Sequence, residues 1–106
     1  MLKNHFFYPT GLVLEPAKKY TQRVEQSFHI SQAALELKSA DLEPVQIVLE
    51  WEGSSFILAT LSKKNSVFQV PLDLNFETGD QISFRTIGKG RVHLSGRNSC
   101  IKTAHG

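Results

Sequence analysis

The sequence has little that would tie it together covalently or hold it in a membrane. Cys100 is the single cysteine among 106 residues, so no intramolecular disulfide can form. Such a chain fits a reducing compartment. No apolar run approaches the length of a transmembrane helix, and Pro9 and Gly11 interrupt the apolar stretch near the start before it takes the form of a signal peptide. We therefore expect a soluble intracellular protein with one domain and no membrane partner.

Carboxylates are missing from the last quarter of the chain. Residues 81–106 hold five basic and no acidic side chains, whereas residues 36–80 hold three lysines and eight carboxylates. The formal net charge of +2 therefore conceals an acidic middle and a basic end. Arg85 and Arg91 alternate with apolar residues, as on the solvated face of a sheet, and their surroundings lack interleaved exposed aromatic residues. We do not expect direct binding to nucleic acid.

Sequence patterns of catalytic and metal sites are absent as well. None of the four histidines has metal-ligand spacing to another histidine or to Cys100: His5, His29, His93 and His105. No G-x-S-x-G motif occurs, and Gly88-Lys89-Gly90 leads into a predicted strand, whereas a phosphate loop leads into a helix. We predict a protein that is not an enzyme and that holds no metal and no cofactor.

What the sequence does contain is a series of short runs in which apolar and polar residues alternate, which is typical of β-strands. Turn residues separate these runs, as at Gly53-Ser54, 63–66, 78–80 and 88–90. The spacing of roughly ten residues predicts eight strands in a sandwich, jelly roll or barrel. The predicted strands cover residues 11–14, 20–24, 28–37, 45–52, 55–61, 67–74, 81–86 and 91–95, and Gly96 closes the last one.

Two runs are less simple. Phe28 to Leu37 alternates as a strand at first, but its later apolar residues also fit the spacing of a helix. A β-bulge would absorb this change of phase, and periodicity alone leaves both alternatives open. Ser55 to Leu61 is apolar on both sides, with Ile57, Ala59 and Leu61 predicted on one face. A strand that is apolar on both sides is usually covered on both, so either the N-terminal segment or another copy of the chain must cover it.

Four stretches together resemble the nucleoplasmin-like domain, in the version at the amino terminus of insect-type nuclear immunophilins, the tacrolimus-binding prolyl isomerases. These stretches are FHISQAAL (28–35), LATL (58–61), VPLDL (70–74) and GKGRVHLSG (88–96). The resemblance covers residues 11–96, which leaves 1–10 as an N-terminal extension and 97–106 as a loose C-terminal tail. It implies an all-β, eight-stranded jelly-roll β-sandwich that forms a ring pentamer, and it implies a strand at 28–37.

The resemblance also implies roles for particular residues. Its pentamer places Ile57, Ala59 and Leu61 against a neighbouring subunit. In nucleoplasmins a loop with an Ala-Lys-Asp core joins two pentamers, and here Ala40 and Asp41 occupy that place without the lysine, which leaves a decamer open. Acidic candidates for histone contact are Glu36, Asp41, Glu43, Glu50 and Glu52.

The resemblance implies an oligomerisation core of a nuclear or nucleolar histone chaperone, with other copies of itself and core histones as partners. Repeated acidic surfaces on a ring would bind basic histones by multivalent contacts. The acidic tracts of nucleoplasmins and a prolyl isomerase domain are missing, so we expect a fragment, a short isoform or a divergent relative. Two alternatives stay open: an oligomeric scaffold that binds no histone, and a monomeric jelly roll that binds a ligand in a pocket.

Overall fold

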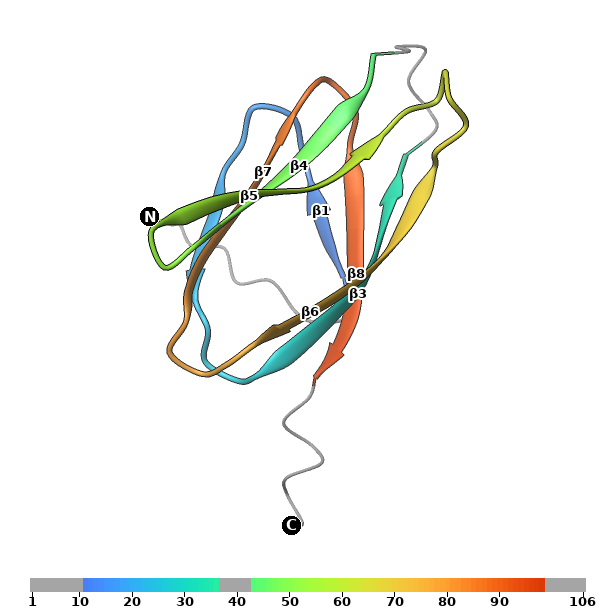
Figure 1. Ribbon diagram of the computed structural model, residues 1–106. Coiled ribbons are helices and arrows are strands. Elements are labelled where there is room, and N and C mark those ends of the chain that lie inside the picture. The colour runs from blue at the N-terminus through green and yellow to red at the C-terminus, as the bar shows by residue number, and fades with distance from the viewer. Residues whose placement is uncertain (1–10, 37–42, 99–106) are drawn as a thin grey trace.

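The computed structural model describes residues 11–36 and 43–98, which form eight β-strands in two sheets (Figure 1). The strands are β1 (Leu12–Leu14), β2 (Tyr20–Arg23), β3 (Phe28–Leu35), β4 (Val45–Trp51), β5 (Ser54–Leu61), β6 (Gln69–Phe76), β7 (Gln81–Ile87) and β8 (Val92–Asn98). Within these described ranges no helix is long and apolar enough to cross a membrane.

The pairing of the strands follows the wrapping order of a jelly roll. One sheet has the order β1-β8-β3-β6 and the other β2-β7-β4-β5. All pairs are antiparallel, and the first strand pairs with the last, the second with the seventh, the third with the sixth and the fourth with the fifth. The predicted all-β, eight-stranded jelly-roll β-sandwich is therefore confirmed.

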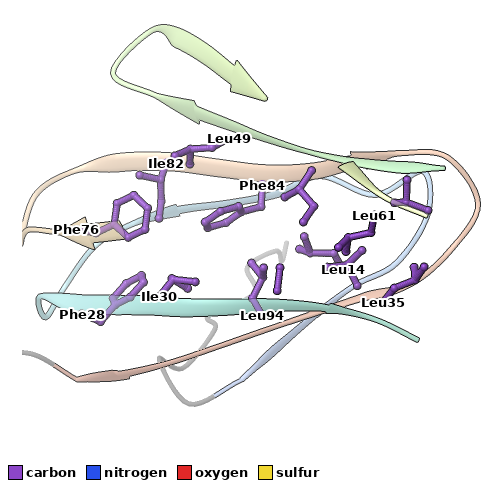
Figure 2. Packing of buried hydrophobic residues seen from close by; sticks show 14 of the residues in the cluster. Leu14, Phe28, Ile30, Leu35, Leu49, Leu61, Phe76, Ile82, Phe84 and Leu94 are labelled. Atoms are coloured by element: carbon purple, nitrogen blue, oxygen red, sulfur yellow. The ribbon is translucent and has the colours of Figure 1, made fainter. Parts of the chain in front are cut away.

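The core lies between the two sheets, where inward side chains meet (Figure 2). The Phe76 ring lies near one end of the core, with its centroid 5.3 Å from that of Phe28 and 6.0 Å from that of Phe84. The predicted alternation in β8 is confirmed, because Val92 and Leu94 are buried while Arg91 and His93 are exposed. Burial of alternate side chains thus holds the sandwich together.

The segment that periodicity left open is a strand. In β3 the register shifts between Ile30 and Gln32 against both neighbouring strands, so Ser31 lies at a bulge. The bulge returns Ala33 to the core side that Ile30 occupies, and both are buried. This irregularity explains why the apolar spacing of the segment also fits a helix.

The β4–β5 hairpin turns one residue earlier than predicted. Trp51 pairs with Ser54, so Glu52 and Gly53 are the two central residues, with φ of 50° and 85°. Positive φ at both positions is the geometry of a type I′ turn, whose twist matches that of the strands. The predicted turn at Gly53-Ser54 is therefore displaced by one position.

The last strand continues past Gly96, so the prediction that the chain leaves the sheet there is wrong. Arg97 and Asn98 still pair with β3. Gly96 stands at the β3 bulge, where a Cβ atom would lie 2.8 Å from Ile30 Cα. Glycine is needed at this position because the two backbones approach closely, and it does not mark the end of the strand. The predicted N-terminal extension and the rest of the predicted tail lie outside the described residues.

Candidate functional site

The four edge strands of the sandwich are protected to very different degrees. Strands β1 and β2 have only three and four residues, and β6 carries Pro71 and Asp73. Short length, proline and charge are the devices that keep sheet edges from pairing with other chains. Strand β5 has none of them, since its eight residues read SSFILATL. It is the least protected edge of the two sheets.

Apolar side chains on β5 remain open to solvent in the single chain. Phe56 is 47% exposed and Ile57 62% exposed. Phe56 pairs with the core residue Leu49, while Ile57 pairs with Val48 on the outer side of the sheet. Both faces of this strand therefore carry apolar side chains, as the sequence indicated.

A bulge separates residues that the sequence placed on one face. Ile47 pairs with Ala59 and Val48 with Ile57, so Leu58 is an extra residue on β5. Ala59 packs against the core and Leu61 is completely buried. The prediction that these two share an outer face with Ile57 is wrong, and so is the predicted contact of Leu61 with another subunit. The contact of Ile57 with another subunit stays a prediction, and Ile57 is exposed on the outer side of the sheet.

The outer surface of the β2-β7-β4-β5 sheet combines apolar residues with an ion-pair cluster. Arg85, Val48 and Ile57 lie in one row across β7, β4 and β5. Exposed Ile87 is opposite Gln46 in an adjacent row. We call this surface, around Val48, Ile57 and Ile87, the β5 face. It is a candidate for contact with another molecule, because monomeric proteins rarely expose large apolar patches.

The charges on the β5 face centre on Glu50. Lys19 Nζ lies 2.9 Å from Glu50 Oε1, and Arg85 Nε lies 3.7 Å from Glu50 Oε2. The hydrogen bond from Lys19 is the main reason why the pKa of Glu50 lies below its ordinary value of 4.5. Two cations thus share one carboxylate, and the cluster has a net charge of +1.

The acidic residues predicted to contact histones do not form one surface. Glu36 accepts a 2.9 Å hydrogen bond from His93 Nε2, and Arg91 lies 3.6 Å from it. Glu43 is exposed near the start of β4. Asp41 and the other residue of the predicted pentamer-joining loop, Ala40, lie outside the described residues. Glu50 and Glu52 do come together, at a shallow hollow lined also by Gly53, Ser55, Gln81 and Ser83.

Three turns at one end of the sandwich lie close together and bring carboxylates from distant parts of the sequence near one another. The β6–β7 turn is joined to the β2–β3 turn by a 2.8 Å hydrogen bond from the Gly79 N–H to the Val24 carbonyl oxygen. The β4–β5 turn is joined to the start of β7 by a bond from the Gln81 N–H to Glu52 Oε2. We call this the acidic end, formed by Glu25, Glu52, Glu77 and Asp80. Within the β6–β7 turn, Asp80 Oδ2 accepts a 2.9 Å hydrogen bond from the Glu77 N–H.

Among the described residues, His29 and His93 face outward from the core. His93 is exposed on β8. His29 is 8% exposed, on the outer side of β3, and its Nε2 lies 2.7 Å from Asp73 Oδ1. Over residues 11–36 and 43–98, no three His, Cys, Asp or Glu side chains are grouped closely enough to hold a metal ion.

Comparison of the sequence with known protein families identifies a family that has this fold. The sequence profile of the nucleoplasmin-like domain matches residues 10–99. The chain belongs to the nucleoplasmin-like domain family. This nucleoplasmin-like domain is 50% identical to the 46 kDa FK506-binding nuclear protein of Spodoptera frugiperda and 41% identical to the 39 kDa FK506-binding nuclear protein of Drosophila melanogaster. Each match covers 81% of this chain, which spans only about a fifth of the relatives' length (21% and 22%).

Two solved structures share the arrangement of strands. The nucleoplasmin-like N-terminal domain of Drosophila FKBP39 has a TM-score of 0.72 and 40% identity, over 83% of this chain and 84% of that one. The Drosophila NLP core has a TM-score of 0.71 and 22% identity, over 83% of this chain and 94% of that one. The NLP core structure is described as giving insight into pentamer formation and histone binding by that protein.

Proposed function

We propose that this nucleoplasmin-like domain is the self-assembling core of a nuclear histone chaperone, in which five copies form a ring that binds core histones. The observation that carries the proposal is the β5 edge, which is long, uncharged and apolar on both faces. An edge of this kind can pair with other chains non-specifically in a single molecule, whereas in an assembly a neighbouring subunit covers it. The relatives named as nuclear proteins support the location.

Covering β5 would stabilise an assembly through modest contributions repeated around the ring. Full burial of an Ile or Phe side chain contributes about 1.5–3 kcal/mol. Ile57 and Phe56 have 62% and 47% of their surface still exposed. Covering that surface on both would therefore contribute roughly 2–3 kcal/mol per contact. Each subunit of a ring makes two such contacts, so the assembly gains more than any single pair of copies.

The acidic end is the surface that best suits a basic partner. Its four carboxylates come from three adjacent turns, and a ring would repeat them five times. Repetition raises avidity through effective concentration. Glu52 belongs to this end, so it remains a candidate for histone contact. Glu36 and Glu50 are paired with cations of their own chain, which offsets much of their attraction for a partner.

The native mass of the purified chain tests the assembly. A pentamer of the 11.9 kDa chain has a mass of about 60 kDa. Sedimentation velocity at micromolar concentration should show this species. A single species of one-chain mass would contradict the proposed assembly.

Histone binding needs its own experiment, because an assembly without it would be a scaffold only. Titration with core histones across a salt series should show affinity that falls as salt rises. Replacing Glu77 by Gln should weaken binding more than the matched replacement of Glu15 by Gln, which removes the same charge elsewhere. Absence of binding at every salt concentration would leave the scaffold alternative.

A further inference from the structure

The ion-pair cluster on the β5 face restricts what can cover that face. Lys19 and Arg85 both pair with Glu50. The side chain of Lys19 is 51% exposed, that of Arg85 38% and that of Glu50 32%. Val48, in the same row as Arg85, is buried beneath this surface, and Ile57 is exposed beside it. A molecule that covers Ile57 will therefore also remove water from a cluster of net charge +1.

An apolar cover alone does not suit this arrangement. Removing water from an uncompensated charge costs several kcal/mol, which would offset what the apolar contacts contribute. A cover that brings one carboxylate to Lys19 and Arg85 neutralises the cluster and gives each cation a partner. The β5 face therefore fits a partner surface that carries an acidic side chain in the middle of a contact.

The chain itself carries one such side chain. Within the described residues only two carboxylates lie inside strands, Glu50 on β4 and Asp73 on β6. The others lie in turns and connections, and Glu36, which directly follows β3, is already paired with His93 and Arg91 of its own chain. Asp73 has a side chain that is 89% exposed, on the outer side of the β1-β8-β3-β6 sheet. Asp73 Oδ1 lies 2.7 Å from His29 Nε2 of the same chain.

We propose that Asp73 of one copy docks against Lys19 and Arg85 of the next copy, an inference that rests on the proposed self-assembly. Asp73 and the β5 face lie on the two opposite outer surfaces of the sandwich. A contact between two different surfaces is heterologous, so it repeats head to tail and closes into a ring when the rotation allows. Two β5 faces meeting each other would instead bring like charges together and give a two-fold dimer.

A double-mutant cycle tests the contact. Asp73→Asn removes the charge but keeps an amide oxygen for His29, and Arg85→Gln removes the cation. The concentration at which the assembly dissociates, followed by sedimentation on dilution, should rise about tenfold for each single variant. The double variant should dissociate at about the same concentration as either single variant, because either substitution alone already removes the ion pair between the two copies.

Matched variants and a charge swap complete the design. Glu15→Gln and Arg23→Gln make the same charge changes outside the contact and should leave dissociation unchanged. Combining Asp73→Arg with Arg85→Asp should assemble better than either reversal alone. If the unaltered chain is monomeric throughout, both the proposed function and this contact are wrong. If it assembles but the effects of Asp73→Asn and Arg85→Gln simply add, or are absent, only the docking of Asp73 is wrong.

Discussion

Replacing Ile57 by lysine is the most direct test of the β5 edge. Ile57 is 62% exposed, so its side chain contributes little to the single chain's core. The substitution loses about a third of the 1.5–3 kcal/mol that full burial of Ile contributes, or roughly 1 kcal/mol of folding stability at most. Lysine is also a residue that natural edge strands use to block pairing. The variant should therefore remain folded.

The same change should strongly oppose assembly. Covering Ile57 contributes about 1–2 kcal/mol from the surface still exposed, and this is lost. Covering lysine beside the cluster of Lys19 and Arg85 adds a desolvation cost of several kcal/mol. The sum is at least about 3 kcal/mol per contact, which corresponds to more than a hundredfold weakening.

Sedimentation velocity over a dilution series measures this effect, and circular dichroism melting checks that the fold is intact. Val13→Lys is a matched control, because Val13 is 38% exposed on an edge strand of the other sheet. Ile57→Lys should be monomeric at concentrations where the unaltered chain and Val13→Lys are assembled. Assembly of Ile57→Lys at the same concentration as the unaltered chain would refute the reasoning.

Three further predictions concern stability and titration. Gly96→Ala should lower the free energy of unfolding by about 3 kcal/mol in urea denaturation, because the new Cβ meets the β3 backbone; unchanged stability would contradict this close approach. Leu61→Ala should cost about 2–5 kcal/mol of unfolding free energy, since Leu61 is completely buried, while the folded variant still assembles. The Glu50 carboxyl should titrate below 4.5 by NMR, and Lys19→Gln should raise its midpoint. The stabilisation from a lowered pKa is present above about pH 4.5 and is lost as pH falls through that lowered value.

Most strands could be predicted because alternation is a local property of the chain. Side chains on a strand point to opposite sides, so the apolar residues of β7 and β8 identify their inner faces without knowledge of the partner strands. The turns at Gly79 and Gly88 were predictable for a similar reason. Both adopt positive φ, which glycine tolerates better than other residues.

The candidate site was predictable only in part. The sequence of β5 shows that the strand is apolar on both sides. Simple alternation also predicted that Ile57, Ala59 and Leu61 share one face. This is wrong, because the bulge at Leu58 places Ile57 on the opposite side of the sheet. A bulge is a property of two paired strands, so the spacing within one strand does not reveal it.

The amino-acid order alone determined which segments become strands and that one of them is apolar on both sides, since both follow from the alternation of side chains along a strand. Tertiary structure alone decided which side chains share a surface. The acidic end joins turns separated by up to 55 positions, from Glu25 to Asp80, and the β5 face joins Lys19 to Glu50. Such neighbours are set by the wrapping of the jelly roll and by strand register, and both arise only when distant segments pair.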